Sequence, residues 1–348
     1  MSQENLSYIL NERPKGAIVP GVTFHQKKTP IPKPEDVKDG EVLAETLYLG
    51  IEPAMRVWLN DARSYTPPVG LGEVMRGYSA ARVLFSKSPR AEVGDIIHAP
   101  TGWSEYAIMS DQEFEPMSHF PELGHPKDMI GTMGIVGLTA WVGMTLFGEP
   151  KPGETVVVSA AAGATGSIAG QIAKIRGARV IGTAGCDKKC QWLKGLGFDE
   201  ALNYKDPDFA CKFNEATKDF VDVCFDGVGG EILDLSLGQA KENSRFVMCG
   251  QISAYNDCKP YAFKHLNNAI LMRSRMQGFI VTDHMDRWGE ARKELAGWIK
   301  EGKLQTTETI VKGGLKVVEQ TLMDLYRGIN RGKLMVEVKN PNESPLQL

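Results

Sequence analysis

The sequence predicts an α/β protein with two domains, a doubly wound parallel sheet and a smaller irregular β module. The chain has 348 residues, which exceeds one ordinary domain of about 100–200 residues. From about residue 150 onward, short apolar segments alternate with helical ones, as in right-handed βαβ units and a parallel sheet. Before about residue 125, short strand-like segments are separated by proline and glycine, which is typical of an all-β module.

Composition limits the partners that we expect for this chain. Hydrophobic residues make up 42% of it, and the formal net charge is −3. Lysine and arginine are scattered rather than grouped, which argues against nucleic acid or an anionic membrane as the main partner. No apolar run reaches the ~18 residues of a membrane span, and neither end carries a targeting pattern. We therefore expect a cytoplasmic protein that acts on a small molecule.

Apolar runs bounded by turn residues predict the individual elements. In the β module, strands are predicted within residues 39–51, 78–85 and 93–100. In the second half, strands are predicted within residues 153–160, 178–185, 221–230 and 244–253, and helices over 166–177 and 188–197. The chain ends with the strand-like segment 332–340, which we expect to rejoin the β module.

A glycine-rich turn joins the first strand of the second half to its first helix. Its spacing, Ala161-x-Gly163-x-x-Gly166, differs from the dinucleotide fingerprint G-x-G-x-x-G only in the first position. Gly163 allows the backbone to approach a pyrophosphate, Gly166 lets the helix pack closely on the strand, and the helix N-terminus supplies N–H groups. An alanine in the first position requires only that the turn avoid a glycine-only conformation there. The turn predicts a dinucleotide site, and the alternative is a strand–helix corner without a ligand.

The residues after the next strand favour NADP(H) over NAD(H). In an NAD site, a carboxylate about 20 residues beyond the turn binds the adenosine ribose. Thr183 occupies that position here, and Asp187, the nearest acid, suits the start of a helix. Lys188 and Lys189 follow directly. A missing acid and a nearby cation match the needs of a 2′-phosphate; the alternative is that Lys189 is a solvated surface lysine.

Residues 160–205 resemble the zinc-independent medium-chain dehydrogenase/reductases. Within them, the chain is similar to the branch of prostaglandin reductase, leukotriene B4 dehydrogenase and alkenal double-bond reductase, with its curcumin reductase relatives. The similarity continues in "YLGIEPAMR" (48–56), "GTMGIVGLTAW" (131–141), "FDGVGGE" (225–231), "CGQISAYN" (249–256), "GFIV" (278–281) and "GINRGK" (328–333). It thus covers nearly the entire chain.

This resemblance implies a fold and an assembly. It implies a GroES-like irregular β-barrel domain over residues 1–128 and an NADP-binding Rossmann domain over residues 129–304. Residues 305–348 would return to the first domain. The resemblance also implies a homodimer.

The resemblance further implies NADPH-dependent reduction of α,β-unsaturated aldehydes and ketones, with hydride delivered to the β-carbon and a proton to the α-carbon. At the pyrophosphate it places Gly163, Ala164, Thr165 and Gly166, and at the 2′-phosphate Lys189 and Tyr204. Beside the nicotinamide it places Cys249, Gly250, Ile252, Tyr255, Phe279, Ile280 and Val281, with Asn330 reaching the cofactor from the tail.

Tyr255 is the candidate for stabilising the enolate, because a phenol can donate a hydrogen bond to a carbonyl oxygen as charge develops there. The alternative is that Tyr255 packs on the cofactor and that the nicotinamide ribose hydroxyl stabilises the enolate. Two positions depart from the family: Ala54 stands where many relatives have tyrosine, and Gly227 where relatives usually have a cofactor-contacting asparagine. Tyr65 either substitutes for the lost phenol or is a structural loop aromatic. Ala54, Met55 and Tyr65 are the predicted substrate-binding residues.

The sequence predicts no metal site. The zinc enzymes of the wider superfamily need a ligand cysteine in the first domain, but no cysteine precedes Cys186. Where those enzymes carry Gly-His-Glu, this chain has "MRGYSAARV" (75–83), and its six histidines are widely separated. Two other functions stay open: a quinone or carbonyl oxidoreductase that uses NADPH, and a non-catalytic NADPH-binding protein.

Overall fold

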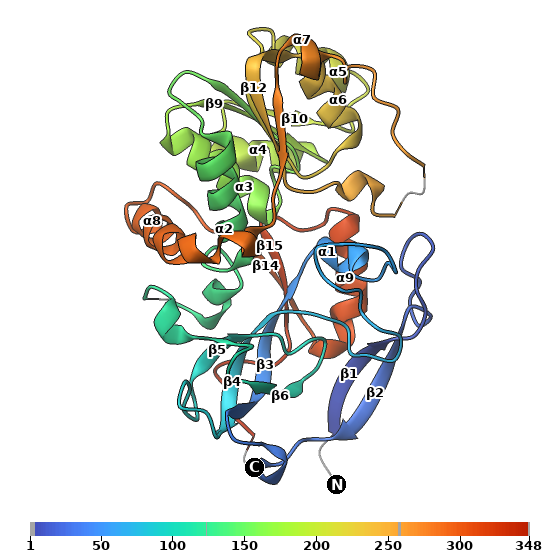
Figure 1. Cartoon of the computed structure of the whole chain (residues 1–348), viewed down its shortest axis with the longest axis vertical. Helices are drawn as coiled ribbons and strands as arrows, with labels where there is room; N and C mark the ends of the chain where they lie inside the picture. Colours follow the sequence, from blue (N-terminus) through green and yellow to red (C-terminus); the bar gives the residue numbers. More distant parts are fainter. Residues whose placement is uncertain (1–3, 123, 257–258, 347–348) are drawn as a thin grey trace. The chain divides into compact units, whose positions relative to one another are not determined.

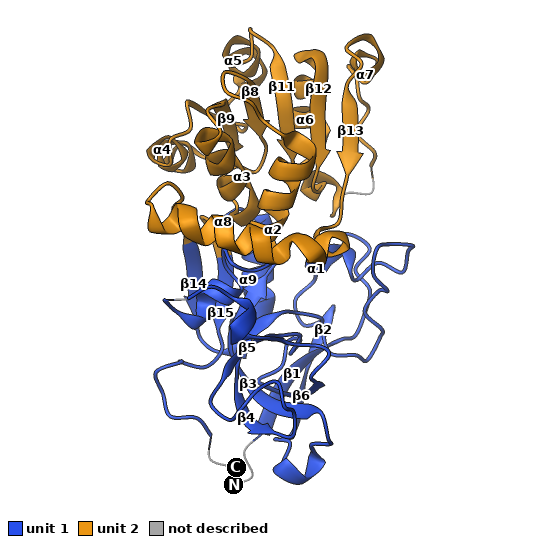
Figure 2. Ribbon diagram, turned by 60° about the vertical axis from the view of Figure 1, so that its left-hand side comes forward, with its two compact units in different colours: residues 1–134, 308–330, 334–348 blue, residues 135–307, 331–333 orange. Residues whose placement is uncertain are grey.

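The computed structural model describes residues 4–122, 124–256 and 259–346. The chain forms two compact units (Figures 1 and 2). Unit 1 contains residues 1–134, 308–330 and 334–348, and unit 2 contains residues 135–307 and 331–333. Among the described residues, no helix is both long and apolar enough to cross a membrane.

Unit 2 is built on a six-stranded sheet in the order β10-β9-β8-β11-β12-β13, with every neighbouring pair parallel. Its strands are β8 (Thr155–Val158), β9 (Arg179–Ala184), β10 (Glu200–Asn203), β11 (Val221–Asp226), β12 (Ala240–Met248) and β13 (Arg275–Gly278). Every residue of β8 and β11 is buried, because a parallel strand in the middle of a sheet is covered on both faces.

The helices of unit 2 form two packed groups. The first contains α2 (Ile135–Val142), α3 (Ala164–Ile175) and α8 (Trp288–Lys300), and the second α5 (Phe209–Ala216), α6 (Gly230–Gly238) and α7 (Asn268–Leu271). α4 (Asp187–Gly195) packs on β9 and β10. In α5, Phe209 and Phe213 lie one turn apart, and both are buried in a core that includes Val221 and Phe246.

The strand order defines a switch point in this sheet. The chain runs from β8 outward through β9 and β10, then returns to β11 and continues outward through β12 and β13 on the other side. β8 and β11 are therefore neighbours in the sheet but not in the sequence. Ligands of doubly wound sheets bind at the carboxyl ends of the strands beside such a point. We therefore expect a ligand site at the loops that follow β8 and β11.

Unit 1 is β-rich and antiparallel. Its larger sheet has the order β14-β15-β3-β4-β5-β7, β6 also pairs with β3, and β1 and β2 form a separate pair. These strands are β1 (Glu4–Leu10), β2 (Phe24–Pro30), β3 (Glu41–Ile51), β4 (Ser79–Ser86), β5 (Ile96–Ala99), β6 (Tyr106–Ser110), β7 (Glu115–Pro116), β14 (Glu308–Lys312) and β15 (Lys333–Glu337). It also contains the α-helices α1 (Ala54–Val57) and α9 (Val318–Tyr326) and short 3-10 helices.

The C-terminal tail is part of the core of unit 1. β15 pairs with β3 in antiparallel register, with Leu334 opposite Ile51. Leu322 of α9 lies in the same apolar cluster as Trp103, which is itself packed against Phe24 at 4.8 Å between ring centroids. The tail therefore packs into the β-rich unit. The predicted fold class, a Rossmann sheet with a separate β-rich module, is confirmed.

Candidate functional site

The glycine turn after β8 has the geometry of a phosphate-binding turn. Gly163 is the N-cap of α3, and no side chain caps that helix, so the first N–H groups of α3 lack intrahelical partners. Among these first residues are Ala164, Thr165 and Gly166. A Cβ on Gly166 would lie 2.5 Å from the carbonyl oxygen of Ala160, so only glycine allows this close approach of helix and strand.

Alanine fits the first fingerprint position because the strained backbone lies one residue earlier. Ala160 has a φ of 46°, whereas Ala161 is not among the residues with positive φ. The N–H of Ala161 donates to the carbonyl of Thr183 at 3.0 Å, which ties the turn to the end of β9. The alanine at position 161 therefore adds no backbone strain to the turn.

The segment 331–333 lies against this turn. Gly332 forms a parallel bridge with Gly163, and its N–H donates to the carbonyl of Ala162 at 3.0 Å. Gly332 has a φ of 64°, and a Cβ there would overlap the carbonyl of Thr307. The backbone of this segment is thus fixed beside the phosphate-binding turn.

Three cations gather at the end of β9 and β10. Burial lowers the pKa of Lys189, and the nearby charges of Lys205 and Arg331 lower it further, against an opposing effect of Cys186. Asp187, the acid closest in sequence, accepts a hydrogen bond from the side chain of Asn203 at 2.9 Å. Such a cluster attracts a dianion such as a 2′-phosphate. Of these three cations, only Lys189 is predicted as a site residue from the sequence.

Tyr204 and Thr183 lie at the same ends of β10 and β9 as these cations. The Tyr204 hydroxyl lies 2.9 Å from where a Cβ of Gly185 would stand, so the ring covers this glycine. Lys205 Nζ lies 6.0 Å from the centre of the same ring. The Thr183 hydroxyl is fully buried at the end of β9 and has no hydrogen-bond partner among the described residues. An unpaired buried hydroxyl, three cations and a glycine cradle fit the adenosine half of NADP(H).

Loops that follow β11 and β12 form the other half of the candidate site. The N–H groups of Cys249 and Gly250 donate to the carbonyl of Asp226 at 2.8 and 3.1 Å. The N–H of Ile252, which begins a short 3-10 helix (Ile252–Ala254), donates to the carbonyl of Gly227 at 3.2 Å. These bonds bring the predicted nicotinamide-side loop to the carboxyl end of β11.

Tyr255 comes directly after that short helix and is half-buried. Its hydroxyl accepts a hydrogen bond from the N–H of Gln251 at 3.3 Å and lies 3.1 Å from where a Cβ of Gly250 would stand. Burial, together with the charge of Asp226, raises the pKa of the Cys249 thiol to about 12. Cys249 is therefore a neutral thiol, while Tyr255 carries a phenol hydroxyl on the same loop.

Phe279, Ile280 and Val281 follow β13, the strand beside β12. Met248 and Gly278, the last residues of these two strands, lie in register, so both loops leave the same edge of the sheet. The Phe279 ring packs on Phe147 with 5.3 Å between centroids. Val281 is buried, and its carbonyl accepts from Trp288 Nε1 at 3.3 Å.

The predicted substrate residues lie in unit 1. Ala54 begins α1 and is half-buried, whereas Met55 is fully buried in the apolar core of unit 1. Tyr65 is 52% exposed, and its hydroxyl accepts from Trp58 Nε1 at 2.7 Å. Asn330 is buried in unit 1, directly before the segment 331–333.

Among the described residues, no group accepts a hydrogen bond from the Tyr65 hydroxyl. Partial desolvation raises the pKa of Tyr65, against the hydrogen bond from Trp58. The hydroxyl thus keeps its proton and can donate a hydrogen bond to a carbonyl oxygen.

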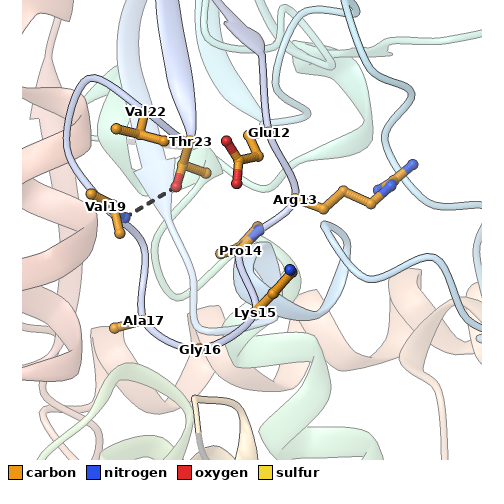
Figure 3. A pocket seen from close by; sticks show the side chains of 9 residues that line it. All are labelled: Glu12, Arg13, Pro14, Lys15, Gly16, Ala17, Val19, Val22 and Thr23. Carbon is orange, nitrogen blue, oxygen red and sulfur yellow. Dashed lines mark hydrogen bonds between the residues drawn. The ribbon is translucent and has the colours of Figure 1, made fainter.

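A hollow of about 450 Å³ in unit 1 is lined by none of these residues (Figure 3). One loop lines it, from Glu12 to Thr23, and the Val19 N–H donates to the Thr23 hydroxyl at 3.0 Å across it. The buried guanidinium of Arg56 holds this loop through the carbonyls of Pro14 and Gly16. We assign the hollow to loop packing. Nowhere in the described ranges do three His, Cys, Asp or Glu side chains group as a metal site requires.

These features define a class of protein, an NADP-dependent oxidoreductase with a Rossmann unit. Two family profiles match, one described as an N-terminal domain of oxidoreductase over residues 7–117 and one as a zinc-binding dehydrogenase over residues 164–297. The NADPH-dependent curcumin reductase of Escherichia coli is 36% identical over 97% of both chains. Prostaglandin reductase 1 of Bos taurus is 39% identical over 86% of this chain and 90% of its own.

A tobacco (Nicotiana tabacum) 2-alkenal reductase, NADP(+)-dependent, is 36% identical over 86% of this chain and 87% of its own. The structure of CurA from Vibrio vulnificus in complex with NADPH superimposes with a TM-score of 0.90 and 37% identity, covering 97% of this chain and 100% of that one. The chain therefore belongs to the medium-chain reductase family of prostaglandin reductase, curcumin reductase and 2-alkenal reductase. It is an NADPH-dependent reductase of that family, as its sequence predicts.

Proposed function

We propose that this protein is a cytoplasmic ene-reductase that reduces the C=C bond of small α,β-unsaturated ketones and aldehydes with NADPH. The observation that carries the proposal is the loop with Tyr255, which is tied to the carboxyl end of the same sheet that carries the phosphate-binding turn. The relatives named for curcumin, prostaglandin and 2-alkenals support this substrate class.

The described residues can hold the whole cofactor. The turn at Gly163–Gly166 would bind the pyrophosphate, and Lys189, Tyr204, Lys205 and Arg331 the 2′-phosphate. Cys249 to Tyr255 and Phe279 to Val281 would border the nicotinamide, with Asn330 added from the tail. When bound, NADPH supplies the hydride that adds to the β-carbon of the substrate.

Tyr255 supplies the electrostatic part of the reaction in this proposal. Its hydroxyl donates a hydrogen bond to the substrate carbonyl oxygen, where negative charge develops. The Gln251 N–H that donates to the same phenol oxygen orients the hydroxyl and makes it a stronger donor. We propose Ala54, Met55 and Tyr65 as the residues that bind the rest of the enone.

The test compares NADPH oxidation with three matched substrates: an enone, its saturated ketone and a quinone. We expect turnover of the enone only, and a loss of about 10²-fold in kcat for Tyr255→Phe. Turnover of quinones or saturated ketones alone would support the oxidoreductase alternative. NADPH binding without any turnover would support a non-catalytic binding protein. An unchanged kcat in Tyr255→Phe would leave enolate stabilisation to the ribose hydroxyl.

We also propose that β13 is the interface of a homodimer. It is the last strand of the unit 2 sheet, and all four of its residues are exposed. Ile270, on the preceding helix α7, is 74% exposed. An uncovered edge strand with apolar neighbours favours pairing with a second copy. Sedimentation equilibrium should show a dimer that Met276→Lys converts to monomer, whereas a wild-type monomer would refute this proposal.

A further inference from the structure

A buried carboxylate lies at the switch point of the unit 2 sheet. Asp226 is the last residue of β11, and its side chain is completely buried. Its carboxylate accepts hydrogen bonds from the Ser159 hydroxyl at 2.6 Å, the Val228 N–H at 3.1 Å and the Gly229 N–H at 2.8 Å. No cation pairs with it among the described residues. A buried carboxylate without a cation is costly, so these donors alone stabilise it.

Ser159 links Asp226 to the neighbouring strand. It follows β8, is buried, and its hydroxyl oxygen accepts the N–H of Gly227 at 2.9 Å. The Ser159 N–H also donates to the carbonyl of Phe225 at 3.0 Å. The pair therefore joins the ends of β8 and β11, two strands that are adjacent in space although 67 residues separate the paired side chains.

The loop that carries Tyr255 rests on this pair through a chain of bonds. The carbonyl of Asp226 accepts the N–H groups of Cys249 and Gly250. The carbonyl of Val228 accepts both the N–H and the hydroxyl of Ser253, at 3.2 and 2.6 Å. Loop 249–255 is thus held by loop 227–229, which is held by Asp226 and Ser159.

We propose that Ser159 and Asp226 are positioning residues for the nicotinamide half of the cofactor. They fix loop 227–229 and, through it, the Tyr255 loop at the carboxyl end of β11. The proposal rests on the proposed function in one respect, since it takes loop 249–255 to border the nicotinamide. The adenosine half would be held elsewhere, at Lys189 and Arg331, and would not depend on this pair.

The same strand offers a matched control at its other end. Asp222 accepts the N–H of Thr155 at 2.9 Å and pairs with Lys241 at 2.9 Å. It therefore ties β11 to the same neighbouring strand, β8, and to β12, but at the amino end of the sheet. A purely structural role of Asp226 predicts equal consequences for both aspartates.

The experiment measures binding of two ligands to Asp226→Asn, Ser159→Ala and Asp222→Asn by titration calorimetry. NADPH reports on both halves of the site, and 2′,5′-ADP reports on the adenosine half alone. We expect Asp226→Asn and Ser159→Ala to weaken NADPH about tenfold or more, with 2′,5′-ADP changed less than about twofold. Asp222→Asn should leave both affinities within about twofold of the wild type.

Equal losses for both ligands, or an equal loss of NADPH affinity in Asp222→Asn, would overturn the proposal. If Asp226→Asn does not fold, Ser159→Ala decides, because it removes a single hydroxyl. Binding is measured without substrate, so a failure of enone turnover in the wild type would refute the proposed reaction and leave this test intact. Conversely, normal NADPH affinity in Ser159→Ala would refute the positioning role and leave the reaction untouched.

Discussion

The N–H of Gly332 donates a 3.0 Å hydrogen bond to the carbonyl of Ala162. This bond attaches a segment from the C-terminal tail to the phosphate-binding turn after β8. It also determines where Arg331 lies, because the neighbouring glycine has a backbone that no other residue adopts without overlap. Arg331 thus joins Lys189 and Lys205 in one cationic cluster, although the sequence separates them widely.

Arg331→Ala and Lys189→Ala should each lower the preference for NADPH over NADH. Each variant removes a charged partner of the 2′-phosphate, which we expect to cost about tenfold in kcat/KM for NADPH. The NADH value should stay nearly constant. Lys188→Ala is the control, since Lys188 is an exposed neighbour on the same helix. A parallel loss with both cofactors would contradict a 2′-phosphate role.

Gly166→Ala should damage the phosphate-binding turn. The new methyl group would lie 2.5 Å from the Ala160 carbonyl oxygen, so we expect a loss of about 1–3 kcal/mol in the free energy of unfolding and weaker NADPH binding. Gly195→Ala in α4 is the control, because a Cβ there meets nothing within 4 Å. It should stabilise the protein by about 0.4–1 kcal/mol. Thermal unfolding of both variants checks the prediction, which fails if Gly166→Ala is as stable as the wild type.

Gly227→Asn should be accommodated and should strengthen cofactor binding. A Cβ at this position meets no atom within 4 Å, and the family resemblance implies an asparagine there that contacts the cofactor. We expect a several-fold lower Kd for NADPH, worth about 1 kcal/mol for one hydrogen bond, with unchanged thermal stability. A weaker affinity measured by calorimetry would show that the loop has no room for the amide.

Tyr65→Phe should affect the substrate and leave the cofactor alone. It removes a donor on the predicted substrate side and an acceptor for the Trp58 indole, so kcat/KM for an enone should fall several-fold. The Kd of NADPH should not change. Tyr48→Phe is the control in the same unit. It also removes a tyrosine hydroxyl that forms a hydrogen bond, here to Glu337 at 3.4 Å, but Tyr48 is not a predicted substrate residue. Equal effects of both variants on turnover would assign Tyr65 a structural role.

Cys249 should resist alkylation at neutral pH. Its pKa of about 12 means that about one thiol in 10⁴ is ionised at pH 8, and the thiolate is the reactive form. The folded-state pKa is raised, so reactivity should increase about tenfold per pH unit up to about pH 12 while the protein stays folded. Cys211, which is exposed, is the internal control in a mass-spectrometric time course. Rapid labelling of Cys249 at pH 8 would contradict its raised pKa.

The features that could be predicted from the sequence depend on residues that lie close together along the chain. The turn at Gly163 and Gly166 was predictable because glycines at that spacing between a strand and a helix have one common use. The fold class followed from alternating strands and helices. Lys189 could be named from the sequence because no acid stands at the position of Thr183 and a cation follows soon after it.

Contacts between distant segments could not be predicted in the same way. Lys205 and Arg331 each look like ordinary surface cations, and only the folded chain places them beside Lys189. The Ser159–Asp226 pair joins strands that are not consecutive, so no local pattern reveals it. Met55 and Ala54 are adjacent in one motif. The sequence of a four-residue helix does not predict which of the two side chains is buried in the core.

The measurement that tests the central claim most directly follows deuterium from NADPH labelled at C4 of the nicotinamide. The labelled cofactor, in each C4 configuration, is incubated with the enzyme and an enone, and the product is analysed by NMR. We predict a saturated ketone with deuterium at the β-carbon from one of the two labelled forms. An allylic alcohol with deuterium at the carbonyl carbon would contradict the proposed reduction of the C=C bond.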